Sequence, residues 1–164
     1  MTERQEKIKR FVEEAIGKFN EHEQYLIKND LSERCICAKY MSHLERVIEH
    51  SDFKEYKVDV EYNRGNNGRT NAVKELRGQK IVVDLIVHMR EPQEDGSFDN
   101  LVCVEMKKAY KRIDMSNDIA RLRNMTSLSG GFNYQAGFMI VADKCNNENM
   151  LRIEREFYYG EEHN

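Results

Sequence analysis

Two stretches near the start of the chain repeat apolar residues at the spacing of an α-helix. From Glu6 to Lys28 an apolar residue recurs every three or four positions, with charged residues between, and this pattern predicts an amphipathic helix. A second helix is predicted to follow, with Asp30 or Ser32 as its N-cap. The predicted buried positions are Ile8, Phe11, Val12, Ala15, Ile16 and Phe19 in the first helix and Ile36, Tyr40, Leu44, Val47 and Ile48 in the second.

Four later segments have the pattern of β-strands. Tyr56–Tyr62 alternates between polar and β-branched residues, whereas Lys80–Met89, Leu101–Lys108 and Ala136–Asp143 are nearly continuous apolar runs. Between the first two strands, residues 63–79 are rich in Asn, Gly and Arg, which predicts a long exposed loop.

Two further helices complete the predicted order of elements. Residues 114–127 carry Met115, Ile119, Leu122 and Met125 at helical spacing, and a short helix is expected over Asn149–Tyr158. The order helix, helix, three strands, helix, strand, helix predicts an α/β (α+β) fold with a mixed central sheet flanked by helices. We expect one domain over residues 1–164, with a helical extension (1–30), a core (31–143) and a C-terminal helix and tail (144–164).

Composition narrows the class of protein. The chain has 164 residues, of which 40% are apolar, and a chain of this size can bury a core of its own. We find no apolar run close to the roughly 20 residues that a membrane helix requires. The charged N-terminal stretch "MTERQEKIKR" has no signal-peptide core, so we expect a cytoplasmic protein with no membrane partner. The four cysteines form no Cys-x-x-Cys pair and are expected to be free thiols.

Charge is unevenly distributed along the chain. The net charge of −3 argues against binding of polyanions by the whole surface. Basic residues nevertheless outnumber acidic ones in residues 64–90 and 107–123, while acidic residues concentrate towards the two ends. A basic middle is a weak indication of nucleic-acid binding. The candidate phosphate contacts in these stretches are Arg64, Lys108, Lys111, Arg112 and Arg121.

The second and third predicted strands bring two carboxylates together. A hairpin that is symmetric about the turn near residues 94 and 95 sets Asp84 directly opposite Glu105. Like charges facing each other in a sheet are destabilising, and a divalent cation between them would remove the repulsion. Carboxylate oxygens suit magnesium. The other residues predicted on this face are Lys80, Val82, Ile86, His88, Leu101, Cys103 and Lys107.

Lys107 adds a positively charged side chain beside the two carboxylates. It lies two residues after Glu105 and therefore points to the same face. A lysine there could neutralise charge on a phosphate, or position and deprotonate a metal-bound water. These are the parts that metal-assisted hydrolysis of a phosphodiester requires. The alternative is that this face meets solvent and that the two acids pair with Lys107 or Lys80.

The arrangement resembles the PD-(D/E)xK nuclease superfamily, the fold of restriction endonucleases. That family places an acid in one strand and Glu-x-Lys in the next, within an αβββαβ core; here Asp84 lies in "VVDLI", and "EMK" spans Glu105–Lys107. Glu33 in "LSERCICAKYMSHL" matches a glutamate that many members carry on the preceding helix. Val83 replaces the proline of the motif, as in many active members. The segments "SERCICAKYMSHLE", "VDVEYNR", "VVDLIVHMR" and "LVCVEMKK" look like small bacterial restriction-endonuclease-like proteins.

The resemblance implies a nuclease that requires Mg²⁺ or Mn²⁺ and acts on DNA rather than RNA. Asp84 and Glu105 would bind the metal together with the backbone carbonyl of Met106. Lys107 would assist the attacking water, and Glu33 would be a further acid of the site.

Two other hypotheses about the function remain open. A catalytically idle module could keep the nuclease fold and bind nucleic acid or a protein partner. A subunit could instead form a homodimer through the Ile8–Phe19 helix, although we expect that apolar face to be core. His88 is interpreted as a partly exposed histidine at a strand end.

Overall fold

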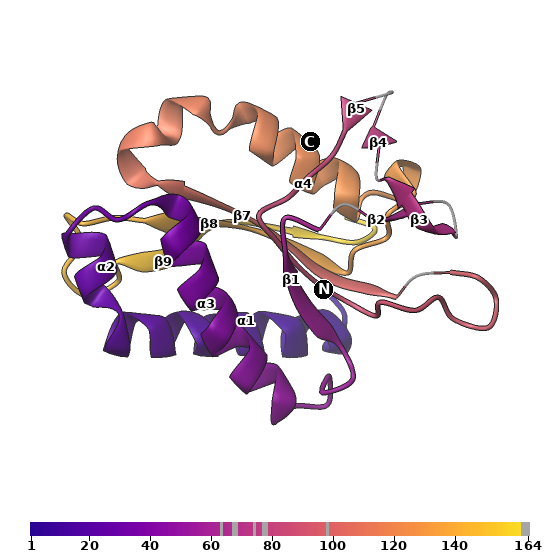
Figure 1. Cartoon of the computed structure of the whole chain (residues 1–164), viewed down its shortest axis with the longest axis horizontal. Coiled ribbons are helices and arrows are strands. Elements are labelled where there is room, and N and C mark those ends of the chain that lie inside the picture. Colours follow the sequence, from indigo (N-terminus) through magenta and orange to yellow (C-terminus); the bar gives the residue numbers. More distant parts are fainter. Residues whose placement is uncertain (63, 67–68, 74, 77–78, 98, 162–164) are drawn as a thin grey trace.

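The computed structural model describes residues 1–62, 64–66, 69–73, 75–76, 79–97 and 99–161, and it describes the side chains of these residues except within 64–79 and 112–114. It is a mixed α/β structure built on a five-stranded sheet with helices on both faces (Figure 1). The strands lie side by side in the order β1 (Lys57–Val60), β6 (Leu85–His88), β7 (Asn100–Lys108), β8 (Ala136–Ala142) and β9 (Leu151–Tyr158).

The sheet is mixed because one of its four pairings is parallel. β7 and β8 run parallel, whereas the β1–β6, β6–β7 and β8–β9 pairs are antiparallel. A parallel pair needs a long crossover connection, and helix α4 (Ser116–Thr126) supplies it. The mixed sheet flanked by helices that the sequence predicts is therefore confirmed.

Helices α1 (Glu3–His22), α2 (Gln24–Lys28) and α3 (Glu33–Glu49) belong to one face of the sheet, and α4 belongs to the other (Figure 1). A capping box starts α1, in which the Thr2 side chain accepts a hydrogen bond from the Gln5 amide. Ser32 caps α3 by accepting a hydrogen bond from the Cys35 amide. Of the two predicted N-caps, Asp30 and Ser32, the helix therefore uses Ser32.

The apolar face of the first helix lies in the core, as expected. All six predicted apolar positions of α1 are buried, and Ile8, Val12 and Phe19 are 0% exposed. They pack in one cluster with residues of α3 and of the sheet. Because this face is buried within its own chain, the hypothesis of a dimer formed through it is wrong.

The expected C-terminal helix is also wrong. Residues 151–158 form strand β9, which pairs antiparallel with β8 along its length. Ile153 and Phe157, four residues apart, fit a two-residue period as well as a helical one, and in a short segment the pairing with β8 decides between them. The sheet therefore extends past residue 143, which was the expected end of the core.

Two strand predictions need smaller corrections. The segment expected to be a long loop contains short strands in its described parts: β2 (Arg64–Asn66) pairs with β3 (Arg69–Val73), and β4 (Glu75–Leu76) pairs with β5 (Gln79–Lys80). Of the strand expected over Lys80–Met89, Leu85–His88 is the part that joins the five-stranded sheet.

The predicted register of the β6–β7 hairpin is confirmed at three positions. Leu85 pairs with Val104, Ile86 with Cys103 and Val87 with Val102. The register shifts between Val87 and His88, as at a β-bulge. Beyond this shift Leu101 packs with the α1 and α3 side of the sheet, so its predicted place on the Glu105 face is wrong. Val82, expected on a buried face, is 37% exposed.

Helix α4 packs closely onto the sheet at Gly137 of β8. A Cβ atom at this glycine would lie 3.2 Å from both Cys103 Sγ and Thr126 Cγ2 and 3.5 Å from Leu122 Cδ2. The absence of a side chain therefore sets how near α4 comes to β7 and β8.

Among the described residues, no helix combines the length and the low polarity needed to cross a membrane.

Candidate functional site

Asp84 lies directly before β6, at the point where the chain enters the sheet. Its carbonyl oxygen accepts a hydrogen bond from the Glu61 amide at 3.1 Å. Its carboxylate Oδ2 accepts one from the Met106 amide of β7 at 2.8 Å. These two contacts hold the Asp84 carboxylate against β7 beside Glu105, where the predicted register places it.

Glu105 lies near the middle of β7 and is 3% exposed. Its pKa is raised to about 8, chiefly by burial and also by the nearby charges of Asp84 and Asp118, while the hydrogen bond and charge of Arg121 oppose this rise. Burial also raises the pKa of Asp84, against hydrogen bonds from the Met106 amide and with Glu105. At neutral pH a proton therefore resides on this pair of carboxyl groups.

Three charged residues surround the pair. The Arg121 Nε donates to Glu105 Oε1 at 2.7 Å, and its terminal nitrogen donates to Asp118. The Lys107 Nζ lies 3.0 Å from the other oxygen of Asp118. Carboxyl groups and cations thus alternate from Glu105 through Arg121 and Asp118 to Lys107 along the interface between β7 and α4.

Asp118 is the residue of this group that the sequence analysis missed. It is 4% exposed and lies on the buried side of α4. The signal was available, because Asp118 occupies a position of helical spacing between Met115 and Leu122. An acid within an apolar stripe must be paired when it is buried.

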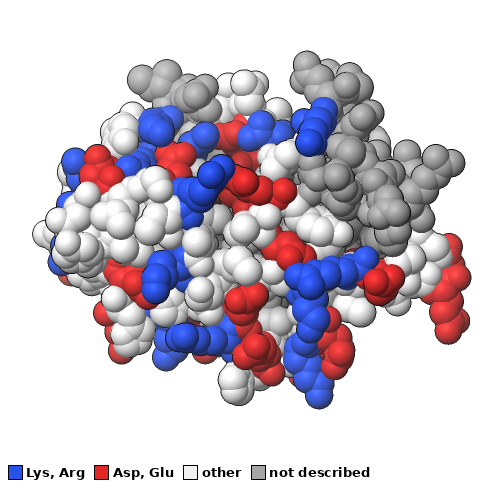
Figure 2. All heavy atoms as spheres, in the orientation of Figure 1, with Lys and Arg blue, Asp and Glu red and all other residues white. Residues whose placement is uncertain are grey.

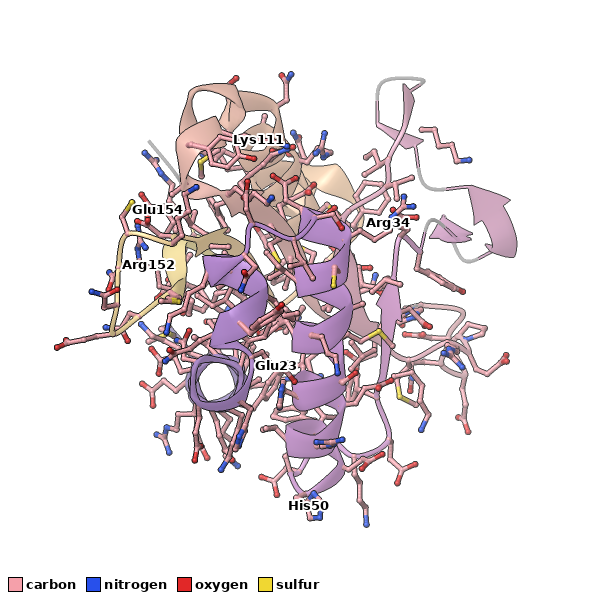
Figure 3. All side chains as sticks on the ribbon, turned by 60° about the vertical axis from the view of Figure 1, so that its left-hand side comes forward. Glu23, Arg34, His50, Lys111, Arg152 and Glu154 are labelled. Atoms are coloured by element: carbon pink, nitrogen blue, oxygen red, sulfur yellow. The ribbon has the colours of Figure 1, made fainter. Side chains whose placement is uncertain are left out.

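Glu33 approaches the pair from the other face of the sheet. It is the first residue of α3, and its carboxylate accepts from the Lys108 amide at 3.2 Å and lies 3.3 Å from Lys111 Nζ. Figure 3 shows Arg34 and Lys111 at the end of α3 where the helix begins. A surface pocket of about 340 Å³ contains both Glu33 and Asp84; its other lining residues are Arg34, Cys37, Ala38, Val60 and Glu61.

The described candidate phosphate contacts are each paired with a carboxylate. Lys108 Nζ lies 2.8 Å from Asp30, Lys111 pairs with Glu33, and Arg121 pairs with Glu105. Lys108 is on the opposite side of β7 from Glu105, since adjacent strand residues face opposite ways. The side chains of Arg64 and Arg112 lie outside the described part of the structure.

The surface shows the same balance of charge. Figure 2 shows Lys and Arg interleaved with Asp and Glu over the face drawn. No broad field of one sign is visible among the described residues of that face, in keeping with the net charge of −3.

His88 does not belong to this site. It is 2% exposed, and its Nε2 lies 2.9 Å from Asp59, which also binds Arg90. The expectation of a partly exposed histidine is wrong, because the Asp59 carboxylate of the neighbouring strand allows the imidazole to be buried.

The donor set at Asp84 and Glu105 fits a hard divalent cation. Both groups are carboxyls, and one end of the pair opens to the pocket that contains Glu33. Within the described residues, no group of three or more His, Cys, Asp and Glu side chains is arranged to hold a metal. A cation here would therefore draw its remaining ligands from backbone carbonyls, water and substrate.

Comparison with protein-family models, with curated proteins and with solved structures finds no match to this chain. The site must therefore be interpreted from its own chemistry.

Proposed function

We propose that this protein is a metal-dependent nuclease of the PD-(D/E)xK type that hydrolyses phosphodiester bonds, with DNA favoured over RNA. The observation that carries the proposal is the pair of half-buried Asp84 and buried Glu105, together with Lys107, which lies two residues after Glu105 on the same strand and points to the same face. The sequence of elements α3, β1, β6, β7, α4 and β8 supports it, since it has the order αβββαβ of the restriction-endonuclease-like core.

Asp84 and Glu105 would hold Mg²⁺ or Mn²⁺, together with the backbone carbonyl of Met106. When bound, such an ion polarises the phosphate and lowers the pKa of a coordinated water. The Met106 amide keeps Asp84 in place through its 2.8 Å hydrogen bond. Glu33, in the same pocket as Asp84, is positioned to accept a hydrogen bond from water on the substrate side.

Lys107 acts in this proposal as a charged donor rather than as a base. Burial works to lower the pKa of Lys107, but the hydrogen bond and charge of Asp118, with the charges of Glu33 and Asp84, raise it overall. The ammonium group therefore stays protonated near neutral pH and can donate to the phosphate in the transition state. Asp118 positions that ammonium group from α4.

A cleavage panel tests the proposal. The protein is freed of metal with EDTA and then incubated with Mg²⁺ or Mn²⁺ and with linear, circular, single-stranded and branched DNA, and with RNA. We expect metal-dependent cleavage that Asp84→Asn and Lys107→Met each abolish. Lys54→Met, at an exposed lysine outside the site, is the matched control, and circular dichroism verifies that each variant is folded. Cleavage that persists unchanged in either site variant would overturn the assignment.

One observation favours a second candidate, a catalytically idle module of the same fold. Arg121 already supplies a positive charge to Glu105 at 2.7 Å, so the carboxyl pair can be balanced without a metal. Calorimetric titration with Mg²⁺ and Mn²⁺ separates the two candidates. Binding that Asp84→Asn removes supports the nuclease, whereas no binding supports the idle module.

A further inference from the structure

Arg121 links the candidate metal ligand Glu105 to a second, fixed carboxylate. Its Nε contacts Glu105 Oε1 at 2.7 Å, and its terminal nitrogen contacts Asp118. The two carboxylate side chains are 4% and 6% exposed, whereas the Arg121 side chain is 31% exposed. The guanidinium therefore lies between a buried site on one side and solvent on the other.

The contact with Glu105 conflicts with a bound divalent cation. Magnesium binds carboxylate oxygen at about 2.0 to 2.1 Å, so an ion on Glu105 would come within a few ångströms of the guanidinium. Two cations at such a distance repel strongly in a buried site. Either the ion stays out or Arg121 leaves Glu105.

Asp118 can keep its contact with Arg121 when Arg121 leaves Glu105. Asp118 is held on the buried side of α4, where it also binds Lys107 at 3.0 Å. Rotation of the long Arg121 side chain about this contact would release Glu105 and turn the guanidinium towards solvent, where a substrate phosphate would lie. Arginine is suited to such a change because its forked donors can bind phosphate and carboxylate alike.

We propose that Arg121 is an exchangeable counter-ion of this acidic cluster, which contacts Glu105 when the metal is absent and contacts the substrate phosphate once the metal has replaced it there. The proposal rests on the proposed function, because it takes the pair of Asp84 and Glu105 as the metal site. It joins two expectations, because Arg121, one of the basic residues expected to bind phosphate, is paired with the expected metal ligand Glu105.

Calorimetric titration with Mn²⁺ alone measures the competition directly. Arg121→Gln keeps a hydrogen-bond donor near Glu105 and removes the charge, so we expect Mn²⁺ to bind about 10-fold more tightly than to the unchanged protein. The matched control is Arg123→Gln, an exposed arginine of the same helix whose guanidinium lies 6.0 Å from the Phe157 ring; its affinity for Mn²⁺ should not change.

A second measurement tests the phosphate role. With Ca²⁺ in place of Mn²⁺ to slow cleavage, Arg121→Gln should bind a short DNA duplex about 10-fold more weakly by fluorescence anisotropy, as expected for loss of one phosphate contact. If Arg121→Gln does not fold, Arg121→Lys replaces it; lysine lacks the fork that spans both carboxylates, and the same two changes are expected at about 3-fold each.

The outcomes separate the two proposals. If Arg121→Gln binds Mn²⁺ as tightly as the unchanged protein or more weakly, the counter-ion role is overturned. The proposed nuclease function is not affected by that result. Undiminished DNA binding overturns the phosphate role. Absence of Mn²⁺ binding in the unchanged protein and in both variants overturns the proposed metal site, and the counter-ion role with it.

Discussion

The buried carboxyl group of Glu105 should make the stability of the metal-free protein fall as the pH rises. Burial raises the pKa of Glu105 from 4.5 to about 8. Between these values the folded protein keeps a proton that the unfolded chain has released. The stabilisation is therefore complete below the unfolded pKa and is lost as the pH rises through the folded one. Glu105→Gln, which has a similar shape and no titrating group, should remove this dependence.

The structure sets the size of the effect. The shift from 4.5 to about 8 corresponds to an upper limit of about 5 kcal/mol at roughly 1.4 kcal/mol per unit. Glu105 is 3% exposed, so solvent screening reduces this little. We expect the free energy of unfolding of Glu105→Gln, relative to the unchanged protein, to increase by about 3 to 5 kcal/mol between pH 5 and pH 9.

Urea denaturation with EDTA at pH 5, 7 and 9 measures this difference. Glu14→Gln, at an exposed position of α1, controls for loss of a carboxylate that is not buried. Parallel pH profiles for Glu105→Gln and the unchanged protein, to within about 1 kcal/mol, would refute the reasoning, because the free energy then would not depend on this carboxyl. A profile of the unchanged protein that rises with pH over the same range would refute it as well.

Two further predictions concern the packing around the site. Gly137→Ala should destabilise the protein by about 1 to 3 kcal/mol in urea denaturation, because its Cβ would lie 3.2 Å from Cys103 and Thr126. Gly17→Ala is the control within α1, where nothing lies within 4 Å of the new Cβ, and it should instead stabilise by about 0.5 to 1 kcal/mol; the reverse order would contradict the close approach of α4. Burial, with the charge of Asp84, raises the pKa of the Cys37 thiol to about 12, so at pH 8 a thiol reagent should modify exposed Cys145 while Cys37 reacts only on unfolding. Peptide mapping after timed labelling measures both rates, and equal rates would contradict this account of Cys37.

The candidate pair could be predicted from the sequence because its register depends on local features. The turn between β6 and β7 and the apolar runs on either side determine which residues face each other. The β-bulge after Val87 could not be predicted in this way, since it depends on how the sheet twists as a whole. Leu101 was misplaced for that reason, while Asp84 and Glu105, on the other side of the bulge, were not.

The element that was wrong, the expected C-terminal helix, is defined by a partner outside its own segment. β9 becomes a strand through pairing with β8. The apolar face of α1 was correctly expected to be core, but its partners, such as Leu151, which contacts Asn20 from 131 residues away, could not be predicted. The periodicity of one segment does not show which other segment it pairs or packs with. Asp118 was missed for a different reason. A charged residue is not expected on the buried face of a helix, although the position of Asp118 lies on that face of α4.

The alternating charges between β7 and α4 make each of these residues dependent on the others. Replacing Arg121 alone leaves two buried carboxylates facing each other, whereas replacing it together with Glu105 removes both ends of one pair. The free energies of such substitutions should therefore be strongly non-additive. In evolutionary terms, Glu105 can be replaced alone because Asp118 still pairs with Arg121, whereas related chains that lack Arg121 are expected to have lost the Glu105 carboxylate as well.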